Sequence, residues 1–419
     1  TSNFRAGVNA GNSIASDGNY NVVVGDEAGT ALTTGDGNVA IGFEALSTED
    51  ANGHNTAIGY QSLKTLNAGA NSRNVAVGYQ AGLDMTTGIR NVLMGTFAGA
   101  NLVAGSNNTA FGEQALITDR NGHHSTALGH AALASQDFAT ATDSNNTAVG
   151  YNAGLSVTTG TSNTLIGGQA GDAITTGGSN VALGTLALSA NTTASENTAV
   201  GYQAAYSTTT GVSNSALGWR SFYTNTTGIQ NVALGERALH LNTTGSYNVS
   251  VGMDSLKANT TASANTAVGY QAGYANTTGT PTTAFGYQAL KANTTGTNNC
   301  AFGQGTLQTN ITGTTNSAFG TLALSANTGS NNSAVGYASL LTNIGGADNV
   351  AMGVSSLRVN TTGGQNTALG TSALIANTTA SNNTAVGYQA VYSNTTGTGN
   401  TGIGGEAGLS LTTSSYNTA

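Results

Sequence analysis

The sequence has one cysteine, one proline and few charged residues, and each shortage excludes a class of protein. Cys300 alone cannot form a disulfide within the chain, so no disulfide framework holds the fold together. Charged residues make up 7% of the chain, against roughly 25% in average proteins. Disordered chains are usually rich in proline and charge, whereas here Pro281 is the single proline. The composition therefore predicts an ordered chain without disulfides.

The charge balance also limits the partners. Only ten Lys and Arg residues are present, and the net charge is −8. They form no basic cluster of the kind that neutralises phosphates, so we expect no nucleic-acid partner. No stretch approaches the ~20 apolar residues that span a bilayer, so we expect no membrane insertion in this segment.

A 17-residue repeat runs through the whole chain. Well-preserved copies read Asn-Thr-Ala-Val-Gly-Tyr-Gln-Ala-Leu and later Asn-Thr-Thr-Gly, and the first glycine recurs about 24 times from Gly7 to Gly404. A fixed short period indicates units that stack on one another. We therefore predict one continuous repeat domain over residues 1–419, with longer repeats at 60–78 and 130–150. Its expected fold is an all-β parallel β-solenoid of about 24 coils.

The constant positions suggest how coils stack. Asparagines one coil apart, about 4.8 Å, can hydrogen-bond into a ladder. The repeat glycine suits a bend with positive φ or a close approach of chains, and Thr-Thr-Gly is typical of a turn with its glycine in the left-handed region. The predicted structural residues are Asn38, Gly42, Asn197, Gly201, Asn265, Gly269, Asn383 and Gly387.

Apolar residues recur in adjacent positions, as in Ala40-Ile41 and Ala45-Leu46. Successive side chains of a strand point to opposite faces, so each pair predicts a strand that is apolar on both sides. One face fills the coil, and the other is expected to pack against another chain, since a narrow coil buries little alone. A trimer is the simplest closed arrangement for a fibre.

The segments Asn38–Ala45, Asn197–Ala204 and Asn265–Ala272 resemble the head repeats of trimeric autotransporter adhesins. The fuller repeat is similar to repeats of bacteriophage tail-fibre proteins and related bacterial fibres. The resemblance covers essentially the whole chain. It implies a left-handed parallel β-roll with three chains side by side in an extracellular fibre. The adhesin heads use a shorter coil, near 14 residues, so a larger cross-section is implied here.

Chemistry-bearing residues are sparse. His123, His124 and His130 lie near the longer repeat without recognisable metal-ligand spacing. Glu27 with Glu44 and Glu236 with Asp254 would stack on adjacent coils, as the paired carboxylates of a glycosidase do, although chance placement explains them better. We therefore expect no enzyme, no catalytic or metal site and no cofactor.

Aromatic residues share the position after the repeat glycine. Such a stripe suits either sugar stacking or a chain–chain seam. It comprises Tyr60, Tyr79, Tyr151, Tyr202, Trp219, Tyr270, Tyr287, Tyr337 and Tyr388.

These observations predict a self-associating, rigid extracellular shaft, as in a phage tail fibre, that holds a receptor-binding tip away from the particle. A bacterial filament or cell-surface adhesin that binds host glycans along the tyrosines is the alternative. An ice-binding solenoid is less favoured, because the Thr-Thr pairs are expected in turns and not on a flat lattice.

Overall fold

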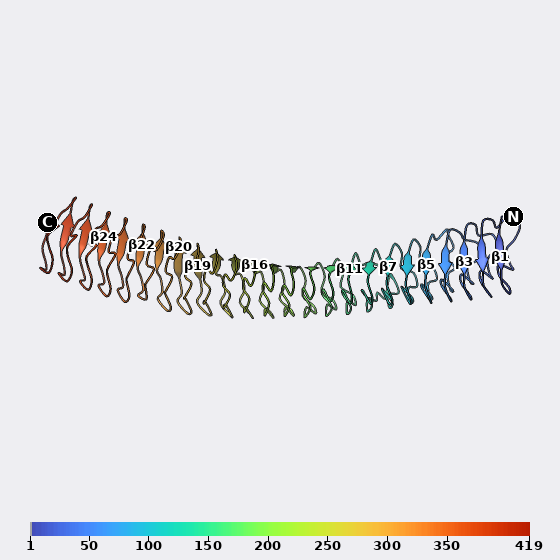
Figure 1. The fold of residues 1–419 in the computed structure, drawn as a ribbon. Helices are drawn as coiled ribbons and strands as arrows, with labels where there is room; N and C mark the ends of the chain where they lie inside the picture. Colours follow the sequence, from blue (N-terminus) through green and yellow to red (C-terminus); the bar gives the residue numbers. More distant parts are fainter. Residues whose placement is uncertain (1) are drawn as a thin grey trace. The chain divides into compact units, whose positions relative to one another are not determined.

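The computed structural model describes residues 2–419, which contain strands and turns and no helix. They form two compact units, one ending at Ser213 and the other spanning Asn214–Ala419. Within each unit, the strand of one coil pairs in parallel with the strand one repeat further along the chain (Figure 1). The register joins equivalent positions, for example Val39 with Thr56. The predicted all-β parallel solenoid of about 24 coils is therefore confirmed.

Nearly all strands are three residues long, and the rest of each coil consists of turns. The strands of the first unit are β1 (Phe4–Ala6), β2 (Val22–Val24), β3 (Val39–Ile41), β4 (Thr56–Ile58), β5 (Val75–Val77), β6 (Val92–Met94), β7 (Thr109–Phe111), β8 (Gly122–His123), β9 (Thr126–Leu128), β10 (Thr142–Asp143), β11 (Thr147–Val149), β12 (Thr164–Ile166), β13 (Val181–Leu183) and β14 (Thr198–Val200). Those of the second unit are β15 (Ser215–Leu217), β16 (Val232–Leu234), β17 (Val249–Val251), β18 (Thr266–Val268), β19 (Thr282–Phe285), β20 (Asn299–Phe302), β21 (Ser317–Phe319), β22 (Ser333–Val335), β23 (Val350–Met352), β24 (Thr367–Leu369), β25 (Thr384–Val386) and β26 (Thr401–Ile403).

The repeat glycine directly follows each of the main strands, and both predicted reasons for it hold. At Gly42, φ is 131°, in a region that residues with side chains rarely adopt. A β-carbon at Gly59 would also lie 2.3 Å from the carbonyl oxygen of Gly78, its equivalent in the next coil. Backbone conformation and close packing of coils therefore both require glycine here.

The Thr-Thr-Gly turn differs from the prediction. Its glycines, such as Gly228, are not in the left-handed region. A β-carbon at Gly228 would instead lie 2.4 Å from the carbonyl oxygen of Gly245 and 2.5 Å from Oδ1 of Asn225. Small size, and not left-handed backbone, selects glycine in this turn.

The predicted strand at Ala45-Leu46 is also wrong, because this pair lies in a turn. Both side chains are fully buried instead of pointing to opposite faces. Leu46 has φ of 50°, and its equivalent Leu63 has φ of 49°. A left-handed residue reverses the alternation of an extended strand, so both side chains enter the coil.

Buried asparagines at the start of most main strands form a hydrogen-bonded series, which we call the strand ladder. Ser125 before β9 and Thr282 in β19 interrupt it. Asn38, Asn197, Asn265 and Asn383 are at most 1% exposed. The backbone N–H of each donates to Oδ1 of the asparagine one coil earlier, at 2.8–3.0 Å. The Nδ2 group of Asn38 donates to the carbonyl oxygen of Asn52, which lies in the turn of its own coil. The Asn38 amide thus joins two coils and closes its own, whereas Nδ2 of Asn265 has no hydrogen-bond partner among the described residues.

The second unit has another buried series, the turn ladder, which the sequence analysis did not identify. The asparagine that opens the Thr-rich turn donates from Nδ2 to Oδ1 of its equivalent one coil earlier, at 2.7–3.3 Å, from Asn242 onward. In the first unit this position is mostly apolar, so the same fold has two kinds of interior. The ladder comprises Asn225, Asn242, Asn259, Asn276, Asn293, Asn310, Asn327, Asn343, Asn360, Asn377 and Asn394. The apolar equivalents are Leu32, Leu66, Met85, Leu102, Val157 and Ile174.

Large and small residues compensate each other between adjacent coils. The middle residue of most strands is alanine, but in β6 it is Leu93. The fourth residue after the repeat glycine is then glycine in both neighbouring turns, at Gly82 and Gly99. A β-carbon there would lie 2.9 Å and 2.8 Å from the Leu93 methyl groups. The same arrangement surrounds Leu165, with Gly154 and Gly171.

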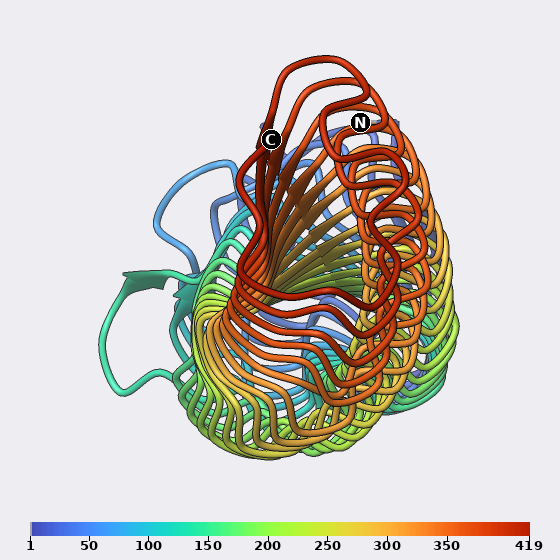
Figure 2. The ribbon, with the colours of Figure 1, turned by 90° about the vertical axis from the view of Figure 1, so that its left-hand side faces the viewer.

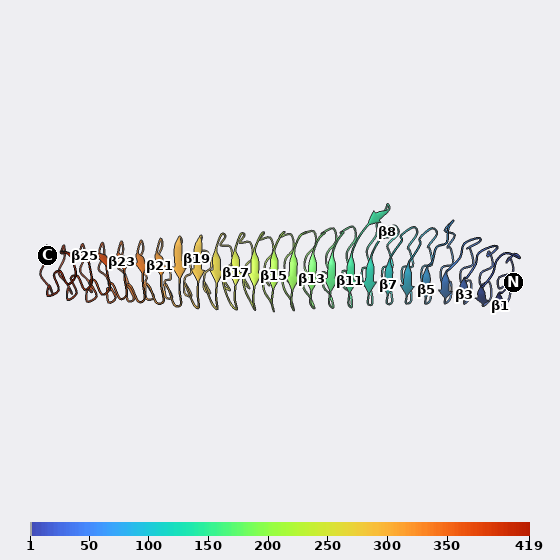
Figure 3. The same ribbon diagram turned by 90° about the horizontal axis from the view of Figure 1, so that it is seen from above.

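The two longer repeats leave the stack of the first unit as loops (Figure 2). The second carries β10, which pairs in parallel with β8 outside the row of main strands (Figure 3). We call residues 136–145 of this loop the arm. The extra residues are therefore accommodated outside the coil, and the register of the main sheet continues from β9 to β11.

We predict that Asn293→Ala weakens the second unit by about 3 kcal/mol. The substitution removes bonds to Asn276 Oδ1 and to the Gly296 carbonyl oxygen, and each stranded buried group costs about 1–3 kcal/mol. Hydrogen exchange of the amides around β19 to β21 should accelerate. Thr295→Ala, at an exposed position of the same turn, is the control. Unchanged protection in Asn293→Ala would contradict the ladder's role.

We predict that Gly99→Ala and Leu93→Ala are coupled by about 1–3 kcal/mol, as expected for groups in contact. The new methyl group clashes with Leu93, so its steric cost disappears once Leu93 is alanine. Gly69→Ala supplies the control, because Gly69 has φ of 69° but open space around it. It measures the left-handed backbone cost alone. Additive effects in urea titrations would refute the packing argument.

Candidate functional site

The most extensive unusual surface is the solvent-facing side of the main strands. In the three-residue strands from β2 onward the middle residue faces the coil and is buried, whereas the first and third side chains point outward. In the four-residue strands β19 and β20, the second and fourth residues point outward. We call these outward residues of β2 to β26, without β8 and β10, the outer strand face.

The outer strand face carries no charged side chain. Its first outward position is Val, Thr, Ser or Cys300, and the other is Val, Ile, Leu, Met or Phe. Several of the latter are well exposed, including Leu217, Phe285 at 50% and Met352. A strand spacing of about 4.8 Å and a length of about 10 Å give the twelve strands of the second unit about 600 Å². Ser and Thr fill eight of the twelve first outward positions, so the apolar part of this area is smaller and lies within the range of the largest apolar patches on monomers, about 300–600 Å².

Aromatic residues concentrate on part of this face. The rings of Phe285, Phe302 and Phe319 stack at centroid distances of 5.7 Å and 5.1 Å. Cys300 lies on the same face in β20 and is half-buried, and burial raises the pKa of its thiol. The thiol is therefore a neutral, small residue at neutral pH, beside the densest apolar part of the face.

The nine predicted stripe residues all lie at the surface, with exposed fractions between 39% and 59%. The structure brings only some together. Tyr60 stacks on Tyr79 at 5.1 Å, and Tyr270 on Tyr287 at 5.4 Å. Tyr60 also stacks on Phe43, so both of its faces are covered. Rings inside such stacks present edges to solvent, which leaves sugar stacking to isolated or terminal rings.

The paired carboxylates considered from the sequence have other partners. Lys64 lies 2.7 Å from Glu44, and its hydrogen bond holds the Glu44 pKa below its usual value. Asp254 lies 3.0 Å from Arg237 and 3.4 Å from Lys257. Glu236 lies 3.6 Å from Arg237, and Glu27 accepts a hydrogen bond from Asn9 Nδ2. In neither pair do the two acids bond to each other, so they do not resemble an acid pair sharing a substrate.

The histidines near the longer repeat are also separately engaged. His123 Nδ1 accepts the backbone N–H of Ser106 at 2.9 Å, whereas His124 Nδ1 lies 3.1 Å from Asp143. His130 stacks on Tyr151. Within residues 2–419, no three His, Cys, Asp or Glu residues are grouped as metal binding requires. The same residues include no helix with the length and apolarity of a membrane span.

Two buried acids were missed by sequence reasoning. Glu49 and Asp119 occupy the interior position that holds Asn or Leu in other coils, and both are fully buried. Burial raises the pKa of each carboxyl above its ordinary value. The sequence does contain a sign of these buried acids, because each one stands at the repeat position where other coils have Asn or Leu.

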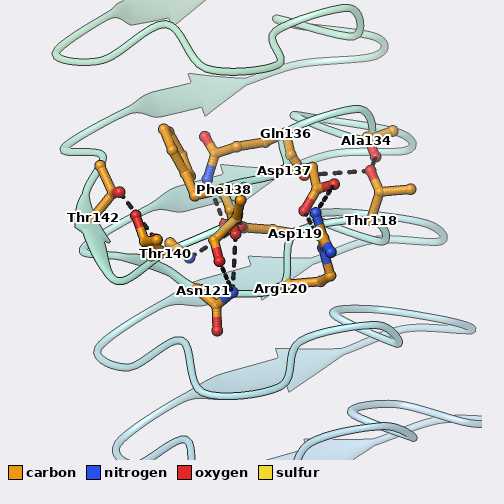
Figure 4. Close-up of polar contacts among 12 residues, drawn as sticks. Thr118, Asp119, Arg120, Asn121, Ala134, Gln136, Asp137, Phe138, Thr140 and Thr142 are labelled. Carbon is orange, nitrogen blue, oxygen red and sulfur yellow. Dashed lines mark hydrogen bonds and ion pairs between the residues drawn. The ribbon is translucent and has the colours of Figure 1, made fainter.

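Asp119 anchors the arm (Figure 4). Its carboxylate accepts hydrogen bonds from Gln136 Nε2 at 2.7 Å and from the backbone N–H of Gly122 at 3.0 Å. At the surface, Arg120 forms a two-point ion pair with Asp137, at 2.8 Å and 2.9 Å. The longer repeat is therefore held by polar contacts built for it.

A comparison with protein-family models gives no match for this chain. None of the curated proteins compared is significantly similar to it.

We predict that Glu49→Gln stabilises the protein at neutral pH. A raised pKa in the fold means that the contribution of Glu49 is complete below the ordinary carboxyl pKa and lost as pH rises through the raised value. An amide keeps the acceptor for Asn52 without the buried charge. The variant should unfold at a higher temperature than the wild type at pH 7, and this difference in unfolding temperature should vanish towards about pH 4.

The exposed Glu113→Gln serves as the control for this pH series. It should follow the wild type at every pH. A Glu49→Gln protein that unfolds at a lower temperature than the wild type at neutral pH would contradict the argument.

Proposed function

We propose that this chain is the structural shaft of an extracellular fibre, in which copies associate laterally through the outer strand face. The shaft holds a receptor-binding tip away from a virion, as in a phage tail fibre, or from a cell surface. The single observation that carries the proposal is the outer strand face itself, which is free of charge and has an apolar residue before the repeat glycine in every main strand from β2 onward.

The size of this face favours another copy as its occupant. A specific interface buries about 800 Å² on each partner. The second unit offers about 600 Å² of outer strand face, and the eleven strands of the first unit offer a further area of about 500 Å². A second copy presents the same repeat spacing, so its rows match those of the first over many coils. No irregular partner shares that period.

A closed arrangement follows from the same geometry. Each chain has one outer strand face, so copies around a common axis can cover all such faces at once. Three chains, the left-handed coil and the viral or cellular setting are the parts of the proposal that the repeat resemblance supplies. The absence of charge on the face favours burial in any such arrangement, because an unpaired buried charge is costly.

We predict a native particle that contains more than one copy of the 41.3 kDa chain, as measured by light scattering or native mass spectrometry. Phe319→Glu places a charge on the outer strand face and should release folded single chains. Ile311→Glu is the matched control, because Ile311 is 49% exposed against 42% for Phe319 but lies in a turn. It should leave the mass unchanged.

Cys300 provides a second readout, since it is the single thiol and lies on the same face. Thiol labelling should be slow in the assembled wild type and fast in Phe319→Glu, with circular dichroism reporting retained strands. A wild type that is folded at the mass of one chain would refute the shaft. Long end-to-end polymers would favour the bacterial filament instead.

A further inference from the structure

The basic residues of this chain are unevenly placed. Four of the ten, Arg220, Arg237, Lys257 and Lys291, fall in five consecutive coils of the second unit. Each is the second or fifth residue after a repeat glycine, so all four lie along the same edge of the stack. This edge is separate from the outer strand face.

Aromatic rings accompany these cations. The Arg220 guanidinium lies 4.7 Å from the ring centroid of Trp219 and 5.4 Å from that of Tyr223. Tyr223 in turn stacks on His240 at 5.2 Å. The Lys257 ammonium lies 5.3 Å from the Tyr274 ring. We call the surface from Trp219 to Lys291 formed by these side chains the basic–aromatic edge.

The edge has a positive charge in a chain whose net charge is −8. Two acids, Glu236 and Asp254, lie among the four cations, and Asp254 is buried against Arg237 and Lys257. Lys291 forms no ion pair within the described part of the chain. Burial lowers the pKa of His240, so its imidazole is neutral at pH 7 and adds no charge.

The second residue after the repeat glycine is charged in three successive coils of this edge. Tyr-Gln follows six of the repeat glycines, whereas these coils read Trp219-Arg220, Glu236-Arg237 and Met253-Asp254. Among the buried positions of these coils, Ala238 and Leu239 are the common residues, whereas Phe222 replaces the common leucine and Ser250 the common alanine.

We propose that the basic–aromatic edge binds an acidic polysaccharide, a function beyond that of the shaft. Guanidinium groups pair with carboxylates through two hydrogen bonds, and the exposed face of an indole suits the apolar face of a sugar ring. No enclosed pocket exists within residues 2–419, so the ligand lies along an open surface. Five coils at about 4.8 Å extend for about 20 Å, which fits a polymer better than a small molecule.

The test uses an oligogalacturonate of ten sugars and its fully methyl-esterified form, which keeps the rings and loses the charge. Trp219 is the single tryptophan, so its fluorescence reports binding directly. We expect the wild-type protein to bind the acid form at least about tenfold more tightly than the ester. The Arg220→Gln protein should bind the acid form about tenfold more weakly than the wild type does, which corresponds to loss of one charge-assisted contact of about 1.4 kcal/mol. Lys291→Gln should also weaken binding.

Arg358→Gln is the matched control, because Arg358 is also the fifth residue after a repeat glycine but lies outside the edge. It should bind like the wild type. Arg237 is left intact, since its loss would strand the buried Asp254. All variants should keep the native mass of the wild type, so this test is independent of the assembly test.

Three results would overturn the proposal. They are equal binding of acid and ester, equal weakening by Arg220→Gln and Arg358→Gln, and equally effective competition by single-stranded DNA of the same charge. The last would show attraction of any polyanion and no saccharide site. No fluorescence change at millimolar oligosaccharide, together with no heat of binding by calorimetry, would likewise exclude the site.

Discussion

The fold depends on hydrogen bonds between identical asparagines one coil apart. Backbone bonds join the coils in the turns as well as in the strands, for example from the Glu44 N–H to the Asp26 carbonyl oxygen at 3.1 Å. The asparagine amides add bonds that form only between equivalent positions. The backbone N–H of Asn38 donates to Asn21 Oδ1, and the same bond recurs at Asn383 with Asn366. A buried amide is costly without partners. A constant repeat length places each asparagine beside its equivalent in the next coil and so supplies those partners. This explains why the 17-residue period is so strictly kept.

The rest of the interior adjusts around this fixed frame through exchanges between neighbours. Leu93 is accommodated because Gly82 and Gly99 leave space above and below it. The position that holds Asn293 in the second unit holds Leu102 in the first, so apolar packing and amide bonding are alternative solutions at one place. Each exchange involves only adjacent coils. Interiors of repeat proteins can therefore vary locally without loss of the stack.

The sequence predicted the solenoid, its period and the strand ladder, because these follow from spacing alone. It did not predict the turns. Ala45-Leu46 has the pattern of a strand, but the left-handed backbone of Leu46 turns both side chains inward, and no propensity favours a leucine there. The turn ladder was hidden because the asparagine of Asn-Thr-Thr-Gly was assigned to turn chemistry. The aromatic stripe was predicted in position, but its stacking depends on which adjacent coils carry rings.

The contrast between the position before and the position after the repeat glycine is the strongest internal argument for lateral association. After the glycine the residue varies freely and includes Glu113, Gly168 and Met253. Before it, in every strand from β2 onward, the residue is Val, Ile, Leu, Met or Phe. Both positions lie at the surface of one chain, so exposure to water alone would let both drift alike. Exclusion of charge from only one of them supports the proposal that this position packs against another copy of the chain.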